Sequence, residues 1–390
     1  MLRLILRALA VLALIIAALA VWKREEIARL GAVLALFDAD RIVENFSHMD
    51  AAFLSRPIPV SGTPLPLPQG APLTLPEGAD AWITDHALTA LVVLTDGALV
   101  HESYHLDTGP EDLRMAWSVA KSVLSALMGV VLAEGAIRSL DDPVTDYAPA
   151  LRGSAYDGTT IRQVLTMQSG VAFNEDYMDF FSDINRMGRV LGLGGSMDAF
   201  AAGLTGRDAT PGTRWQYVSI DTHVIGMVIR GATGRAIPDL VSEKLFLPLG
   251  LEAEPYYVTD GLGEAFVLGG LNLRTRDYAR IGQLFLQQGQ AGGRQIVPAD
   301  WVAASTAPQA NTPPGAMGYG YQWWIPPGAT EGEFLAQGVY GQFIYVNRPA
   351  GVVIASNAAH RGFTADGVED RNIAMFRAIA AAAVAAKQGG

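Results

Sequence analysis

The sequence predicts an α+β fold, in which an antiparallel β-sheet flanked by helices is joined to a mostly helical part. Strand-like runs lie near both ends of the chain and enclose a long region whose apolar residues recur at helical spacing. The first strands form a hairpin, because Asp96-Gly97 suits a type I′ turn and separates the apolar runs 91–94 and 99–104. Strands from both chain ends would then share one sheet, which is typical of α+β domains.

The remaining elements follow from the same patterns. Strand-like runs return at residues 320–325, 343–347 and 352–355, and helices are expected at 118–134 and 370–387. Residues 26–77 are helical at first and then proline-rich, which indicates an extended connector. We expect one domain over residues 78–387, with its sheet at about 80–115 and 318–387 and its helical part at about 118–317.

Residues 1–25 predict an N-terminal transmembrane or signal helix. Arg3 and Arg7 open an apolar stretch, and residues 4–22 would span about 28 Å as a helix, close to the hydrocarbon thickness of a membrane. The alternatives are an uncleaved signal anchor and a signal peptide cleaved after Ala18-Leu19-Ala20. Both place the folded domain outside the cytoplasm, in a bacterial periplasm, and the first also holds it to the membrane.

Composition excludes several classes of protein. The formal net charge of -11 argues against binding to nucleic acid, which requires clusters of lysine and arginine. The chain has no cysteine, so disulfides, thiolate zinc sites and cysteine nucleophiles are all excluded. Lysine is rare and occurs only at Lys23, Lys121, Lys244 and Lys387.

His101-Glu102-Ser103-Tyr104-His105 spells the H-E-x-x-H signature of zinc proteases. That motif needs a helix, so that both histidines lie one turn apart and share the metal. Here it follows the Asp96-Gly97 turn and continues a strand, on which residues four apart are separated by about 13 Å. We therefore expect two strand histidines, no metal site and no cofactor.

Ser118-Val119-Ala120-Lys121 is an S-x-x-K at the expected start of a helix. Positions i and i+3 share a helix face, so Lys121 can reach the Ser118 hydroxyl. A serine needs an adjacent base to act as a nucleophile, and a lysine serves as that base only when it is neutral. Mostly apolar neighbours make its desolvation plausible. A capping serine with a surface lysine is the alternative.

A second segment favours the catalytic interpretation. Pro211-Gly212-Thr213 marks a turn, and Tyr217 follows it directly before an apolar helical run. A tyrosine hydroxyl near a lysine can pass a proton between a nucleophile and a leaving group. A tyrosine buried in the core is the alternative.

Taken in order, these segments resemble the motifs of the serine β-lactamase superfamily, and in particular its class C β-lactamase-like esterases, D-alanyl-D-alanine carboxypeptidases and nylon-oligomer (6-aminohexanoate-dimer) hydrolases. The resemblance covers about residues 80–385. The matching segments are Trp117-Ser118-Val119-Ala120-Lys121-Ser122, Leu165-Thr166-Met167-Gln168-Ser169-Gly170, Pro211-Gly212-Thr213 with Tyr217-Val218-Ser219, Gly269-Gly270-Leu271-Asn272-Leu273, and Gly338-Val339-Tyr340-Gly341-Gln342.

The resemblance implies roles for these positions. Ser118 would form an acyl-enzyme, Lys121 would act as the base and Tyr217 as the proton shuttle. The backbone N–H groups of Ser118 and Val339 would form the oxyanion hole. Further substrate contacts would come from Glu175, Tyr177 and Asp183 in an acidic loop, and from Ser219, Gly338 and Tyr340.

Two departures from the family pattern shape the prediction. Ser219 stands where the family has asparagine, and the third motif lacks its lysine or histidine, since Ala336-Gln337-Gly338 or Gly338-Val339-Tyr340 takes its place. In the family that cation binds the carboxylate of β-lactams and of cell-wall peptides. We therefore predict a serine hydrolase of small amides or esters. The alternatives are a cell-wall-directed peptidase or β-lactamase and an inactive binding module.

Overall fold

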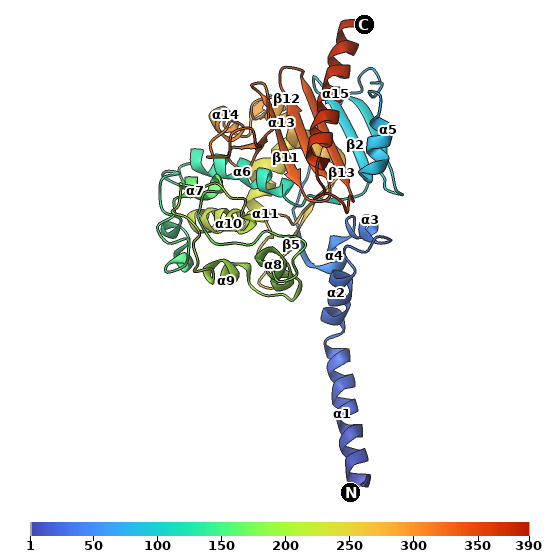
Figure 1. Cartoon of the computed structure of the whole chain (residues 1–390), viewed down its shortest axis with the longest axis vertical. Coiled ribbons are helices and arrows are strands. Elements are labelled where there is room, and N and C mark those ends of the chain that lie inside the picture. Colours follow the sequence, from blue (N-terminus) through green and yellow to red (C-terminus); the bar gives the residue numbers. More distant parts are fainter. Residues whose placement is uncertain (1, 390) are drawn as a thin grey trace.

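The computed structural model describes residues 2–389 of the chain, and it has the predicted α+β architecture (Figure 1). Its main sheet has seven strands in the order β3-β2-β13-β12-β11-β10-β9, and all neighbouring strands are antiparallel. These strands are β2 (Leu88–Thr95), β3 (Ala98–Tyr104), β9 (Gly318–Tyr319), β10 (Trp324–Ile325), β11 (Glu333–Gly338), β12 (Gln342–Asn347) and β13 (Val352–Ala358).

The hairpin of β2 and β3 confirms the prediction, and Asp96 and Gly97 both have the positive φ that a type I′ turn requires. Strand β11 was not predicted, and the expected run 320–325 is strand only at Trp324–Ile325. The proline-rich connector lies along the free edge of β3, where the N–H of Leu99 donates to the carbonyl of Pro68 over 2.8 Å. The connector thereby covers an edge that would otherwise leave backbone groups unpaired.

Helices cover both faces of the main sheet. Side chains alternate across a strand, so Leu91 and Val93 of β2 face α5 (Ala79–Asp85) and the C-terminal α15 (Val368–Gly389). Val92 and Leu94 lie in the other hydrophobic cluster, with α6 and α13. The predicted helix after Ser118 is confirmed as α6 (Val119–Ala133), and α13 spans Thr275–Leu286.

The helical part lies beside the sheet and is built mainly of short helices (Figure 1). A second sheet, in the order β1-β5-β6-β4, joins it to the N-terminal residues. Two of its strands, β5 and β6, lie within the region predicted to be mostly helical. The elements are α7 (Ile161–Leu165), α8 (Asp183–Gly192), α9 (Met197–Ala202), α10 (Ser219–Thr233), α11 (Ile237–Val241), α12 (Leu247–Leu249), α14 (Ala299–Ser305), the single turns η1 (Val144–Asp146), η2 (Pro149–Leu151) and η3 (Ser242–Phe246), and strands β1 (Leu54–Pro57), β4 (Arg114–Met115), β5 (Tyr256–Thr259), β6 (Leu271–Leu273), β7 (Gln290–Ala291) and β8 (Arg294–Gln295).

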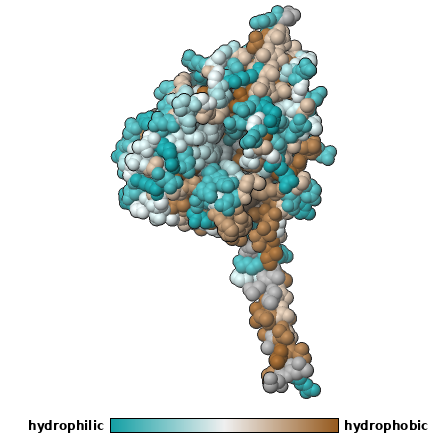
Figure 2. All heavy atoms as spheres, in the orientation of Figure 1, coloured by the Kyte–Doolittle hydropathy of each residue, from teal (hydrophilic) through white to brown (hydrophobic). Residues whose placement is uncertain are grey.

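The N-terminal residues form α1 (Leu2–Trp22), α2 (Arg24–Leu34), α3 (Ile42–Asn45) and α4 (Met49–Ala52). Helix α1 projects from the body, and Figure 2 shows apolar residues along it. Among residues 2–389, however, no helix is both long enough and apolar enough to cross a membrane. The predicted transmembrane anchor is therefore not supported. The uncharged stretch between Arg7 and Lys23 would measure about 22 Å as a helix, which is short of the roughly 30 Å hydrocarbon core.

Candidate active site

Ser118 lies directly before α6, and Lys121 occupies the first turn of that helix. The one-turn spacing brings the Lys121 Nζ within 3.0 Å of the Ser118 Oγ. The same nitrogen donates a hydrogen bond of 2.8 Å to the carbonyl of Leu268. The Lys121 side chain is almost fully buried, so the geometry favours a catalytic pair over a capping serine with a surface lysine.

Burial decides the charge of Lys121. Removing the ammonium from water lowers the pKa of Lys121 to about 7, and the nearby charge of Glu175 opposes this shift only in part. A substantial fraction of Lys121 is therefore neutral near neutral pH and carries a lone pair that can accept a proton. The arrangement can activate the Ser118 hydroxyl.

Tyr217 lies on the segment directly before α10, and its ring centroid is 5.4 Å from the Lys121 Nζ. Trp324 of β10 stacks on this ring, with centroids 5.3 Å apart. Burial, and next the charge of Glu175, raise the pKa of Tyr217, while hydrogen bonds to Ser118 and Ser219 act against this increase. Tyr217 therefore stays protonated at neutral pH and can donate its proton next to Ser118.

The end of β11 lies against the start of α6. A Cβ on Gly338 would lie 2.7 Å from the carbonyl oxygen of Ala116 and 3.1 Å from the backbone nitrogen of Ser118, so only glycine allows this approach. Ser118 and Val339 line the same cavity, which has a volume of about 280 Å³. The two backbone segments proposed for an oxyanion hole are thus brought together across 220 residues of sequence.

Glu175 accepts hydrogen bonds from the backbone N–H and the hydroxyl of Ser219 and from the hydroxyl of Tyr177. Its carboxyl is buried, and desolvation raises the pKa of Glu175 although Lys121 and the hydrogen bonds counteract it. Tyr177 lines the cavity. The acidic residues of this loop are thus not simply a solvated surface, because the carboxyl of Glu175 is withdrawn from water and interacts with the charge of Lys121.

Asp183 and Tyr340 lie outside the cavity lining. The carboxylate of Asp183 accepts the backbone N–H of Asn174 and forms an ion pair with Arg186, so it closes the base of the loop. Tyr340 packs instead against Phe37 and Phe363. Gly338 lines the cavity as expected.

Much of the cavity lining comes from residues outside the motifs that match the family. Among them are Trp324, His360, Phe363, Val368, Glu369 and Asn372. The lining has no lysine or arginine, and burial lowers the pKa of His360, which keeps its imidazole mostly neutral at pH 7. The site thus has no permanent cation at the place of the missing third motif. Phe363, Val368 and His360 lie near the end of the chain and gave no sequence signal, because only the fold brings them into the same cavity as Ser118.

The first four residues of the H-E-x-x-H segment lie on β3, as predicted, and His105 directly follows the strand, so the segment is not helical. The imidazoles of His101 and His105 each form a hydrogen bond to the Ser103 hydroxyl, at 3.1 and 3.0 Å. Glu102 points elsewhere and pairs with Arg276 over two hydrogen bonds. Within residues 2–389, no group of three or more histidine, aspartate or glutamate side chains is placed to hold a metal ion.

The fold and the pocket define the class of protein, which is a serine hydrolase. A family model described as beta-lactamase matches residues 84–375, and the chain belongs to this family. Within it, the chain falls in the branch of the 6-aminohexanoate-dimer hydrolases. The enzyme of that name from Paenarthrobacter ureafaciens is 31% identical over 272 residues, which are 66% of this chain and 69% of that protein.

The chain is also similar to two further proteins. A Bacillus anthracis structure assigned to the 6-aminohexanoate-dimer hydrolases has the same fold, with a TM-score of 0.77 at 24% identity over 88% of this chain and 95% of that chain. Penicillin-binding protein 4 from Amycolatopsis lactamdurans is 31% identical over 185 residues, 44% of this chain and 46% of that protein. The chain thus spans under half of that second relative.

Proposed function

We propose that this enzyme hydrolyses small amide or ester substrates through an acyl-enzyme on Ser118. The observation that carries the proposal is the buried Lys121 Nζ, 3.0 Å from the Ser118 Oγ. A lysine whose pKa is lowered to about 7 by burial can accept the hydroxyl proton at physiological pH. No metal or cofactor is required for this chemistry.

The reaction would proceed in two halves. Neutral Lys121 takes the proton of Ser118 as the oxygen attacks the carbonyl carbon, and the N–H groups of Ser118 and Val339 stabilise the oxyanion. Tyr217 gives its proton to the leaving amine or alkoxide and is reprotonated from Lys121. A water molecule then attacks the ester carbonyl of the acyl-enzyme, and its proton returns through the same groups, which releases the acid and restores Ser118.

We propose that Tyr177 and Gly338, which line the cavity, contact the substrate. Ser219 is buried outside the lining, and we propose that it acts through Glu175, which binds both Ser219 and Tyr177. Tyr340 and Asp183 would act from outside the cavity, by shaping the β11–β12 turn and the acidic loop. Without a cation in the lining, the cavity suits a substrate that has no carboxylate beside the scissile bond.

A cell-wall-directed peptidase is the second candidate, since one relative is named a penicillin-binding protein. In both cases we propose that the enzyme works in an exported compartment, the bacterial periplasm, because two arginines precede the apolar stretch at the N-terminus. Fractionation of cells that express the full chain tests this location, and recovery in the cytoplasm would contradict it.

The test of the proposed function compares Ser118→Ala with the wild-type enzyme. Hydrolysis of p-nitrophenyl acetate should fall by about 10³-fold or more, because the nucleophile is lost. A fluorophosphonate should add one phosphonyl group to the wild-type chain, at Ser118 by peptide mass spectrometry, and none to the variant. Near wild-type turnover in Ser118→Ala, or a label on another residue, would show that a different nucleophile acts.

A further inference from the structure

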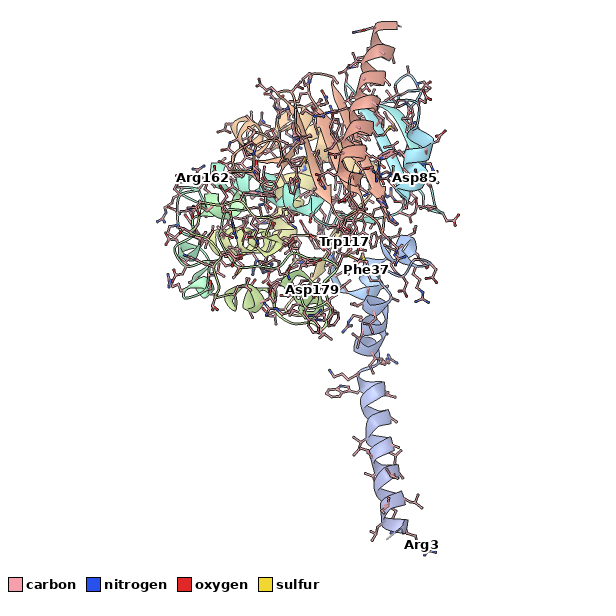
Figure 3. All side chains as sticks on the ribbon, in the orientation of Figure 1. Arg3, Phe37, Asp85, Trp117, Arg162 and Asp179 are labelled. Atoms are coloured by element: carbon pink, nitrogen blue, oxygen red, sulfur yellow. The ribbon has the colours of Figure 1, made fainter. Side chains whose placement is uncertain are left out.

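Two aromatic side chains from the N-terminal segment pack against the residues that flank the candidate oxyanion hole. Phe37 stacks on Tyr340, with ring centroids 5.1 Å apart and planes at 14°, and it lies 6.0 Å from Trp117. Phe46 meets the same two rings edge-on, at 5.5 Å from Trp117 and 5.3 Å from Tyr340. Figure 3 shows Phe37 and Trp117 beside each other where the N-terminal helices meet the body. We name these four residues the aromatic clamp.

The two inner members of the clamp have unusual backbones. Trp117 has φ of 44° and Tyr340 has φ of 62°, in the left-handed region that bulky residues rarely adopt. Trp117 directly precedes Ser118, and Tyr340 directly follows Val339. Trp117 therefore directs the peptide group that carries the Ser118 N–H, whereas Tyr340 fixes the peptide group that follows Val339 and so anchors Val339 from its carboxyl side. Such conformations persist only where their surroundings hold them.

The N-terminal segment is firmly attached at this place. The buried guanidinium of Arg114 donates hydrogen bonds to the carbonyl of Val43, at 2.7 Å, and to the hydroxyl of Ser47, at 2.5 Å. The carbonyl of Phe46 accepts the backbone N–H of Met115 over 3.0 Å. Phe46 is thus bound to Met115, which lies three residues before Ser118, and the ring of Phe46 is buried.

Phe37 is less enclosed. It remains 40% exposed, although apolar side chains of neighbouring residues such as Leu36 are buried. The amide of Asn45 donates hydrogen bonds of 3.0 Å to the carbonyls of Ala35 and Leu36, which holds the turn just before Phe37. A half-exposed phenylalanine held in this way contributes little to the core, so its ordered stacking on Tyr340 needs another explanation.

We propose that Phe37 and Phe46 are positioning residues that hold Trp117 and Tyr340 in their left-handed conformations and so keep the oxyanion hole aligned. This proposal rests on the proposed function of Ser118 and Val339. Because the hole binds the oxyanion and not the ground-state carbonyl, loosening the clamp lowers transition-state stabilisation and leaves substrate binding nearly unchanged. The N-terminal segment is then part of the catalytic apparatus and not only a connector.

The test uses Phe37→Ala in the full chain, with Leu34→Ala as the matched control, because Leu34 is 76% exposed in the same segment and outside the clamp. For Phe37→Ala we expect kcat to fall about tenfold, which is below the effect of removing a whole oxyanion donor, with KM within about twofold. Affinity for an alkylboronic acid, whose adduct places an oxygen in the hole, should fall by a similar factor. Phe37→Tyr should restore both values, and Leu34→Ala should change neither.

Three outcomes would overturn the proposal. The first is unchanged kcat and boronate affinity in Phe37→Ala. The second is a change confined to KM, which would make Phe37 a substrate contact. The third is an equal loss in Leu34→Ala. If Phe37→Ala lowers the melting temperature, Phe37→Leu gives the same comparison in a folded protein. These outcomes are distinct from failure of the proposed function, which would appear as an active Ser118→Ala variant.

Discussion

The Lys121 Nζ lies 3.0 Å from the Ser118 Oγ and has almost no contact with solvent. If this nitrogen acts as a base, its basicity matters and not its positive charge. Lys121→Arg should then lower kcat/KM nearly as much as Lys121→Ala, by about 10³-fold or more, because arginine stays protonated at any working pH. Steady-state hydrolysis of p-nitrophenyl acetate by both variants measures this. Substantial activity in the arginine variant alone would show that position 121 supplies charge.

The pH dependence of kcat/KM should reflect the titration of Lys121. Burial lowers the pKa of Lys121 to about 7, so the neutral, active form dominates above that value and the protonated form below it. We expect kcat/KM to fall about tenfold per pH unit on the acidic side and to level off above pH 8. The measurement is kcat/KM from pH 5 to 9 with an uncharged ester. A profile without this acidic limb would exclude Lys121 as the base.

The charge of Glu175 should influence the pH at which this activity is lost. Its charge raises the pKa of Lys121, so Glu175→Gln should move the acidic limb to lower pH. The variant should also lose about tenfold in kcat, because the hydrogen bonds from Ser219 and Tyr177 then lack a charged acceptor. Glu254→Gln, an exposed carboxylate far along the chain, is the control and should leave the limb in place. An acidic limb that stays fixed in Glu175→Gln would show that Glu175 carries no charge there.

Local signals explain what the sequence could predict. The turn at Asp96-Gly97, the S-x-x-K spacing and the tyrosine before an apolar helix each involve a few neighbouring residues, and the structure places all three as expected. The pairing of Glu175 with Ser219 was beyond prediction in its detail, since it joins the acidic loop to the first residue of α10, 44 residues further along the chain.

Contacts between distant segments explain what was missed. Strand β11 was not recognised because Glu333–Gly338 has no regular alternation of polar and apolar residues, and its pairing with β10 and β12 appears only in the folded sheet. His360 enters the cavity only through the fold of the sheet, whereas its neighbour Arg361 is exposed and does not line the cavity. Phe37 stacks on Tyr340, which lies 303 residues further along the chain, and no sequence pattern predicts this contact.

The absence of a cation from the cavity lining gives the most discriminating prediction. A charge-assisted hydrogen bond to a carboxylate contributes about 1.5–3 kcal/mol, which is tenfold or more in affinity, and no lining lysine or arginine can form one. We expect kcat/KM for a cephalosporin reporter to be at least about 100-fold lower than for an acetate ester at pH 7.5, where His360 is neutral because burial lowers its pKa. Comparable values would contradict the amide or ester assignment and favour the cell-wall-directed alternative. In that case Arg361→Ala and His360→Ala should each be assayed with both substrates. A variant that loses cephalosporin hydrolysis and keeps ester hydrolysis would identify the group that binds the carboxylate of the cephalosporin.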